Sequence, residues 1–323
     1  MSSTPATDSM PDCTVIVPVF RNAGQIPALL ERLAGLHKTV PGGIEAVLVV
    51  DGSPDDSHTQ LQAALPDQSF PSQLLSLSRN FGSFAAIRVG LQAAEGRYFA
   101  VMAADLQEPA ELVIDMLAAL RADRADVVVG TRASRRDPWT SRLAARLFWS
   151  LNRRLVEGDI PSGGVDVFGC NRAFREQLLQ FSETHSSLIG QLFWLGFRRL
   201  EIPYDRQASL ADNSGWSLGA KFKYFLDSLF AFTDVPIRAF ILLGLLGLLI
   251  SLMLLVVIVI ARLSGAIDVP GYTATVTIIV FFSGLNLFGL GVIGSYVWRA
   301  YENTKQRPLA VVMEQQRFDG DRP

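Results

Sequence analysis

The chain has 323 residues, which is enough for one large domain or two modest ones. Its net charge is −2 and its pI is about 6.0, a balance that argues against a nucleic-acid-binding protein. Hydrophobic residues make up 49% of the chain, and many of them gather in two uncharged runs near the C-terminus.

The N-terminal two thirds alternate short apolar runs with segments of helical periodicity. Residues 1–11 are rich in Ser, Thr and Pro, so we expect a disordered start without a signal peptide. The predicted strands are Thr14–Val19, Glu45–Val50, Gln73–Leu77, Tyr98–Met102 and Asp126–Gly130, and the predicted helices are Ala23–Leu36, Ser57–Leu65, Gly82–Ala94 and Pro109–Arg121. This alternation predicts an α/β domain with a parallel, doubly wound sheet, which binds ligands at the carboxyl ends of its strands.

Two uncharged runs, Ala239–Ala261 and Val269–Trp298, follow this domain. Each is long enough to cross a bilayer, so we expect transmembrane helices at 236–262 and 272–298. The connection Leu263–Tyr272 contains no Lys or Arg, whereas the outer flanks of both runs are basic. The positive-inside rule therefore predicts a multi-pass protein of the inner, cytoplasmic membrane, with its N-terminal domain and both termini, including a tail at 299–323, in the cytoplasm.

Basic amphipathic segments lie between the sheet and the first predicted span. Trp139–Val156 interleaves arginines with a leucine stripe, and residues 211–235 contain Lys221, Lys223 and a Phe-rich stretch. Such helices suit a membrane interface, although a helix packed on its own domain fits the pattern nearly as well. Cys13 and Cys170 show no metal-binding spacing, and we expect reduced thiols.

Polar residues follow two of the predicted strands. Asp51-Gly52-Ser53 comes after the second strand, and Asp105-Leu106-Gln107-Glu108-Pro109 comes after the fourth. The carboxylate and amide oxygens of the second segment suit a hard cation that bridges a diphosphate. A turn and a helix N-terminus explain the same residues without any ligand.

Five segments in order resemble one protein family: VIVPVFRN (15–22), VVDGSPDDS (49–57), LSRNFGSFAA (77–86), MAADLQEP (102–109) and VVVGTR (127–132). They are similar to the inverting family 2 glycosyltransferases of the GT-A fold. The branch they resemble most is that of the polyprenyl-phosphate glycosyltransferases, such as dolichyl-phosphate mannose synthase and the bactoprenol glucosyl transferases. The resemblance extends over nearly all of Cys13–Arg299 and implies a GT-A (Rossmann-like) nucleotide-sugar domain at 12–210.

The resemblance also implies roles for individual residues. The nucleotide-binding set is Pro18, Phe20, Asp51, Ser53, Arg79, Gly82 and Asp105, and the ligands of a Mg²⁺ or Mn²⁺ ion are Asp105 and Gln107. Two positions depart from the family pattern. Val50 replaces the first acid of Asp-Asp-Gly-Ser, and Ala103 replaces the first acid of Asp-x-Asp. The loss of the second carboxylate predicts weaker cation binding.

The acceptor side lacks the Glu-Asp pair and the Gln-x-x-Arg-Trp motif of relatives that act on sugar hydroxyls. A lipid phosphate is already anionic near neutral pH, so it needs cations that dock it rather than a general base. The candidate acceptor-phosphate residues are Arg132, Arg135, Arg136, Arg206, Ser214 and Lys221. Asp166 either orients a substrate hydroxyl or a phosphate-binding arginine, or is a structural acid at a strand end, and the pattern favours neither interpretation. The candidate catalytic residues are Asp105, Asp166 and Arg132.

These features predict a glycosyltransferase that moves a hexose from a nucleotide sugar, UDP-linked by resemblance, to undecaprenyl phosphate for cell-envelope glycosylation. A flippase and a second transferase would then act on the lipid-linked sugar. Two alternatives stay open: a transferase to a glycan or another lipid, and an inactive membrane scaffold that keeps the fold. Paired spans are also compatible with a homo-oligomer.

Overall fold

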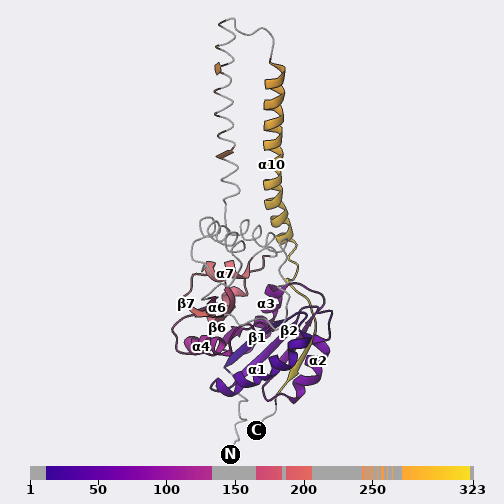
Figure 1. Ribbon diagram of the computed structural model, residues 1–323, viewed down its shortest axis with the longest axis vertical. Helices are drawn as coiled ribbons and strands as arrows, with labels where there is room; N and C mark the ends of the chain where they lie inside the picture. The colour runs from indigo at the N-terminus through magenta and orange to yellow at the C-terminus, as the bar shows by residue number, and fades with distance from the viewer. Residues whose placement is uncertain are drawn as a thin grey trace, which may run out of the picture.

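The computed structural model describes residues 12–132, 165–183, 187–205 and 271–320, together with isolated positions between 242 and 264. These residues form an α/β domain and one long helix that projects from it (Figure 1). The strands are β1 (Cys13–Val19), β2 (Ile44–Val50), β3 (Ser72–Leu77), β4 (Tyr98–Val101), β5 (Val127–Arg132), β6 (Val165–Asn171), β7 (Arg199–Tyr204) and β8 (Val312–Phe318). The helices are η1 (Ala23–Gln25), α1 (Ile26–Thr39), α2 (Ser57–Ala64), η2 (Leu65–Asp67), α3 (Ser83–Ala93), α4 (Ala110–Arg121), α6 (Arg172–Leu178), α7 (Leu188–Trp194) and α10 (Tyr272–Thr304).

All five predicted strands and all four predicted helices are present, with small shifts at their ends. The predicted α/β class of the domain is therefore confirmed. The prediction of a wholly parallel sheet is wrong, because the eight strands lie in the order β7-β5-β6-β4-β1-β2-β3-β8 and two of them are reversed. β6 runs antiparallel to β4 and β5, and β8 runs antiparallel to β3.

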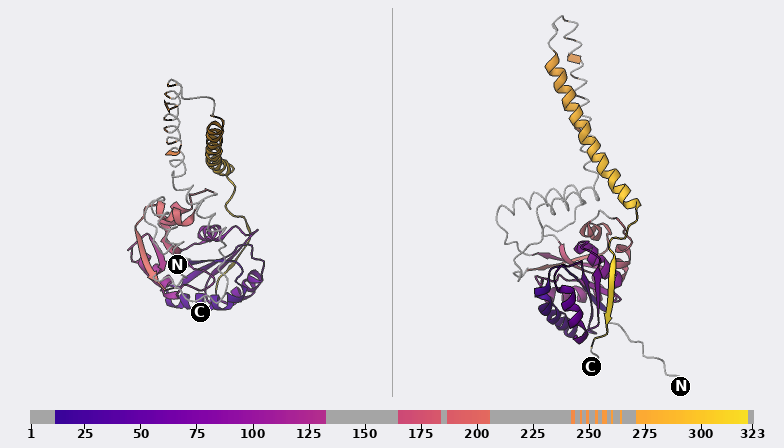
Figure 2. Two further views of the ribbon diagram at one scale, coloured as in Figure 1. Left: turned by 45° about the horizontal axis from the view of Figure 1, so that its top comes forward. Right: turned by 90° about the vertical axis from the view of Figure 1, so that its right-hand side faces the viewer.

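The direction of β8 follows from its place in the chain. It comes soon after α10 and pairs with β3 so that Val312 lies opposite Leu77 and Phe318 lies opposite Ser72. Figure 2 shows β8 lying along the domain and running away from α10. Since β3 is antiparallel to β8, the carboxyl ends of the parallel strands point toward the α10 end of the molecule. Residues 312–318 of the predicted tail are thus part of this sheet.

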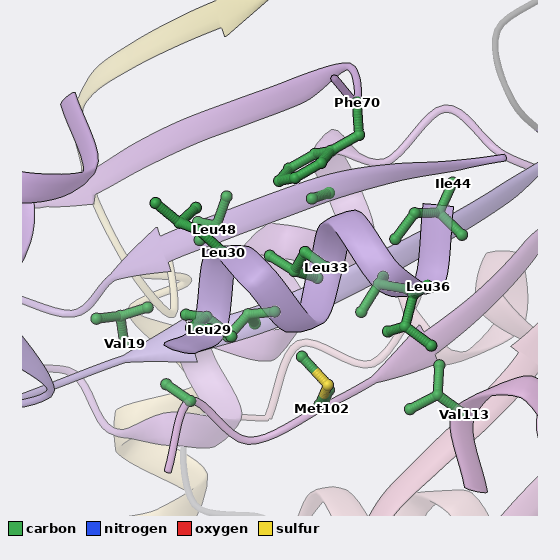
Figure 3. Close-up of a cluster of buried hydrophobic side chains, with 14 of the residues drawn as sticks. Val19, Leu29, Leu30, Leu33, Leu36, Ile44, Leu48, Phe70, Met102 and Val113 are labelled. Carbon is green, nitrogen blue, oxygen red and sulfur yellow. The ribbon is translucent and has the colours of Figure 1, made fainter. Parts of the chain in front are cut away.

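Helices cover both faces of the sheet, and the strands of its centre are accordingly buried on both sides. Helices α1, α2 and α4 pack on one face, and α3, α6 and α7 pack on the other. Figure 3 shows the first of these clusters, in which the α1 leucines lie against β2 and Phe70; its labelled residues are Val19, Leu29, Leu30, Leu33, Leu36, Ile44, Leu48, Phe70, Met102 and Val113. The two clusters hold the strand ends, and the loops that follow them, in place.

Both cysteines are free and buried in this core, as the sequence predicts. Burial raises the pKa of the Cys13 thiol to about 11 and that of the Cys170 thiol to about 12. Because thiolate is the reactive form, these cysteines are chemically inert at neutral pH.

Helix α10 contains the second predicted span, 272–298, and continues to Thr304. Its 33 residues correspond to a length of about 50 Å. Exposed large apolar side chains line it, namely Ile279, Leu287, Leu290, Ile293 and Val297. Judged on the described residues alone, no helix of the structure is both long and apolar enough to cross a membrane.

Three further predicted segments lie outside the described residues: the helix at Trp139–Val156, the interface helix at 211–235, and the first span at 236–262 apart from isolated helical positions. These predictions are not tested by the structure.

Two helix glycines provide a matched test of packing. An added Cβ at Gly90 of α3 would lie 2.4 Å from Ile16 Cγ2 of β1, whereas a Cβ at Gly35 of α1 would meet nothing within 4 Å. We expect G90A to lower the free energy of unfolding by about 1–3 kcal/mol, because the core is overpacked. G35A should raise it by about 0.5–1 kcal/mol through helix propensity. Urea denaturation of the two variants measures both effects, and a stabilising G90A would contradict the close packing of α3 on β1.

Candidate active site

Four loops meet at the carboxyl edge of the sheet because β1, β2, β3 and β4 run parallel and lie side by side. They follow these strands at residues 20–22, 51–56, 78–82 and 102–109. Every nucleotide-binding and metal-binding residue predicted from sequence lies in one of these loops, except Pro18. Pro18 lies in β1 opposite Val49, two residues before the first loop. The fold thus brings the predicted donor-side residues to one edge.

Asp51 joins the second loop to the third. Its side chain is only 2% exposed, and it accepts hydrogen bonds from two backbone N–H groups, from Phe81 to Oδ1 at 2.7 Å and from Gly82 to Oδ2 at 2.8 Å. Bonds of this kind to a charged acceptor are among the stronger ones in proteins. Asp51 therefore holds the loop Ser78–Gly82 in place. A direct contact between Asp51 and a nucleoside stays a prediction.

Gly52 allows this close approach of the two loops. Its φ is +56°, and an added Cβ would lie 2.3 Å from the carbonyl carbon of Arg79. Only glycine fits both the left-handed backbone and the neighbouring loop. The Asp-Gly pair, which the sequence offers as a simple turn, is thus the point where two loops touch.

Ser53 and Asp55 join the second loop to the first. Ser53 Oγ accepts a hydrogen bond from the N–H of Arg21 at 2.7 Å and donates one to Asp55 Oδ1 at 2.6 Å. The N–H of Ala23 donates to Asp55 Oδ2 at 3.0 Å. Burial works to raise the pKa of Asp55, but hydrogen bonds from Ser53, Ser57 and the backbone outweigh it and lower that pKa to about 2. Asp55 is therefore ionised at all ordinary pH values.

Phe20 and Arg79 present an aromatic ring and a cation at this edge. Phe20 is 38% exposed, and the Arg21 guanidinium lies 5.3 Å from its ring centre. Arg79 is exposed, and its guanidinium stacks 4.1 Å from the ring centre of Phe81. Aromatic faces bind bases by stacking, and guanidinium groups bind phosphate oxygens. The edge therefore offers the chemistry that a nucleoside diphosphate requires.

The loop after β4 holds the candidate metal ligands. Asp105 Oδ1 accepts a hydrogen bond from the N–H of Gln107 at 3.3 Å, and Leu106 between them has a φ of +57°. Gln107 is only 8% exposed, yet its amide oxygen Oε1 has no hydrogen-bond partner. A buried, unpaired amide oxygen is costly unless a ligand satisfies it. The pair Asp105 and Gln107 therefore fits a hard cation, which prefers such oxygens.

Among the residues that the structure describes, no group of three His, Cys, Asp or Glu side chains is arranged to hold a metal. Ala103, at the position of the family's first metal-binding acid, supplies no oxygen from its side chain.

The acceptor-side predictions are tested least. Arg132 is the half-buried last residue of β5, opposite Tyr204 of β7. Asp166 lies in β6, and its side chain is outside the described set. The other predicted acceptor residues, Arg135, Arg136, Arg206, Ser214 and Lys221, also lie outside the described residues.

Arg88 of α3 is a site-adjacent residue that sequence reasoning overlooks. Its guanidinium donates to Gln191 Oε1 of α7 at 3.0 Å and to the carbonyl oxygen of Phe181. It thereby ties the helix that begins at the third loop to α7. The sequence signal is weak, because an arginine within an otherwise apolar helix face is all that marks it.

The fold is a mixed α/β sheet with helices on both faces, and the residues that the sequence predicts for the donor side lie at one edge of it. Residues 14–181, which are more than half of the chain, match the family described as Glycosyl transferase family 2. The protein belongs to glycosyl transferase family 2 and is a glycosyltransferase. The resemblance inferred from the five sequence segments is thereby confirmed.

Relatives match over nearly the whole chain. An uncharacterized glycosyltransferase of Synechocystis sp. is 29% identical over 94% of this chain and 95% of its own length. The putative glycosyltransferase CsbB of Bacillus subtilis is 29% identical over 93% of this chain and 91% of its own length. The SfII prophage-derived bactoprenol glucosyl transferase of Shigella flexneri is 27% identical over 94% of this chain and 98% of its own length.

Asp51 and Asp56 form a matched pair for mutation. Asp51 is buried and holds two backbone N–H groups, whereas Asp56 is exposed and makes no capping bond to α2. We expect D51A to lower the free energy of unfolding by about 2–4 kcal/mol, because two partly buried backbone donors lose their buried acceptor. D56A should change it by less than about 0.5 kcal/mol. Denaturation curves of both variants measure the difference, and equal stabilities would contradict the role of Asp51.

Proposed function

We propose that this glycosyltransferase moves a hexose from a nucleoside-diphosphate sugar, UDP-linked, to a polyprenyl phosphate, with inversion at the anomeric carbon. The observation that carries the proposal is the gathering of Phe20, Asp51, Arg79, Asp105 and Gln107 at one edge of the sheet, on the side from which α10 leaves. The donor half rests on the chemistry of that edge. The acceptor half of the proposal rests on the position of this edge near the end of α10 and on the bactoprenol glucosyl transferases among the relatives.

The donor would lie across the loops after β1 to β4. In this proposal the base lies near Phe20 and the loop Ser78–Gly82, and the diphosphate lies toward Asp105. Asp51 and the Ser53–Asp55 pair act by fixing the loops rather than by touching the reacting atoms. Loops that are fixed before the substrate arrives lower the entropy that binding has to overcome.

Asp105 and Gln107 would hold a Mg²⁺ or Mn²⁺ ion. Such an ion supplies positive charge to the departing nucleoside diphosphate. The buried, unpartnered Oε1 of Gln107 supports this assignment, because a cation would satisfy it. With Ala103 in place of a second carboxylate, the diphosphate itself would complete the coordination.

The acceptor proposal rests on where the edge lies. The chain from Thr304, at the end of α10, to Val311, beside the third loop, can extend over at most about 25 Å. The donor edge is therefore close to the end of α10. We propose that α10 and the uncharged run Ala239–Ala261 anchor the protein in the inner membrane. A lipid phosphate at the bilayer surface would then reach this edge.

The arginine at the end of β5 and the names of the relatives also support a lipid phosphate as the acceptor. A lipid phosphate attacks without a general base, and the arginine at the end of β5, Arg132, is a candidate to dock it. Bactoprenol glucosyl transferases align with this chain over 93–94% of its length, which supports a polyprenyl-linked acceptor and a role in cell-envelope glycosylation. Both termini and the catalytic domain would then face the cytoplasm. The product would need a flippase and a second transferase.

The direct test is a transfer assay with the intact chain in membranes. A panel of radiolabelled nucleotide sugars is supplied with undecaprenyl phosphate, with and without Mn²⁺. We expect lipid-extractable label from one UDP-hexose, dependent on the lipid phosphate. D105A should lower the rate by about 100-fold or more, because charge stabilisation at the leaving group is lost. D115A, which removes an exposed carboxylate from the outer side of α4, should leave the rate unchanged.

Two outcomes separate the alternatives. Transfer of label to a glycan or to another lipid in the absence of polyprenyl phosphate would contradict the proposed acceptor. Binding of a nucleotide without turnover over every sugar and cation would favour an inactive scaffold.

A further inference from the structure

The donor loop Ser78–Gly82 is held from two sides. Its last residues are held by Asp51, as described above. Its first residue, Ser78, donates its backbone N–H to the carbonyl oxygen of Val311 at 3.0 Å. Only Arg79 and Asn80 lie between the two attachments. One of the three hydrogen bonds that hold this loop thus comes from a segment more than two hundred residues away in sequence.

That segment is β8 with the residue before it, Val311–Phe318, which we name the C-terminal strap. Within the described part of the chain, β8 is the outermost strand of the sheet and pairs with β3, and Val311 extends this contact to Ser78 just beyond β3. The segment just before the strap also contacts the core, since Ala310 packs against the same buried cluster as Phe81 and Phe84 do. The strap therefore borders the donor loop at its beginning and extends along β3 away from it.

Side chains of the strap contact the rest of the domain at three further points. Gln315 donates to the Oε1 of Gln73 at 2.9 Å, and Gln73 in turn donates to the buried carboxylate of Glu45 at 2.6 Å. Glu314 lies 3.8 Å from the Nε2 of His58 on α2. At the far end, Arg317 forms an ion pair with Glu95 at 2.6 Å. These contacts define one register for the strap, and hence one position for the carbonyl oxygen of Val311.

We propose that the C-terminal strap is a positioning element of the donor site, which sets the conformation of Arg79 and Asn80 and thereby the affinity for the nucleoside diphosphate. The inference rests on the proposed donor site. Because the strap is joined to α10 by only residues 305–310, the donor loop is also fixed relative to the end of α10. A purely structural edge strand would stabilise the sheet without selectively altering donor binding.

The charge pair at the far end of the strap permits a test that leaves the donor loop untouched. In the full chain, R317E places a second carboxylate against Glu95, and E95R/R317E restores an ion pair of reversed sense. We expect R317E to raise the Kd for UDP about threefold, since exposed ion pairs are weak, and to speed amide exchange at residues 78–82. Exchange in β1 and α1 should not change. E95R/R317E should return both quantities to the values of the parent chain.

A larger perturbation is a chain that ends at Pro308, with the peptide 309–320 supplied in solution. We expect its Kd for UDP to rise about tenfold or more and to recover when the peptide is added. Donor KM should rise with it, while the KM for undecaprenyl phosphate stays unchanged. If the shortened chain does not fold, R317E still decides the question.

The proposal is overturned if R317E speeds exchange at residues 78–82 and leaves UDP affinity as it was, or if the shortened chain binds UDP as tightly as the parent. It is also overturned if donor and acceptor KM rise together, because that pattern indicates a general loss of structure. Failure of the intact parent chain to bind UDP is a separate result. That result would remove the proposed donor site itself.

Discussion

The carboxylate of Asp51, buried at the end of β2, accepts two backbone N–H groups from the loop that follows β3. An ionised side chain with so little exposure is stable in a protein interior only when its oxygens are satisfied. Here the satisfying groups belong to Phe81 and Gly82, so the charge and the loop conformation depend on each other. The exposed Arg79 and the start of α3 take their positions from this arrangement. The proposed donor edge is organised around this interaction.

The order and direction of the strands in the mixed sheet decide which segments border this edge. Four parallel strands place their loops side by side, and the reversed strand β8 brings the chain back from α10 to the same edge. The loop Ser78–Gly82 consequently lies between a carboxylate from β2 and a carbonyl oxygen from the strap. In this view the proposed membrane segments and the donor site are parts of one arrangement, since the strap that borders the site continues from α10.

The sequence predicts the centre of the fold well because its strands are buried on both faces. Apart from their first residues, Thr14–Val19 and Glu45–Val50 are apolar, and such runs between turn residues are easy to recognise. The strand β8 has the polar sequence VMEQQRF, and its stability comes from pairing with β3 and from Gln315 rather than from its own hydrophobicity. Local periodicity does not reveal a strand of that kind.

The sequence predicts the location of the candidate site residues about as well as it predicts the centre of the fold. The motifs locate Asp51, Asp105 and Gln107 at one edge, and the structure brings them there. What spacing does not reveal is that Asp51 holds a loop thirty residues away, because that contact depends on the pairing of β2 with β3. It also does not reveal the unpartnered oxygen of Gln107, which is a property of burial. Arg135, Arg136 and the other acceptor residues beyond the described ranges stay predictions.

The most direct measurement of the central claim is an experimental structure of the intact chain with UDP and Mn²⁺. The account predicts a cation bound by the carboxylate of Asp105 and by Oε1 of Gln107, within about 2.0–2.4 Å of each. It also predicts the diphosphate beside that cation and the Asp51 carboxylate still bound to the N–H groups of Phe81 and Gly82. A nucleotide bound at another edge of the sheet, or a cation that leaves Gln107 Oε1 unliganded, would contradict it.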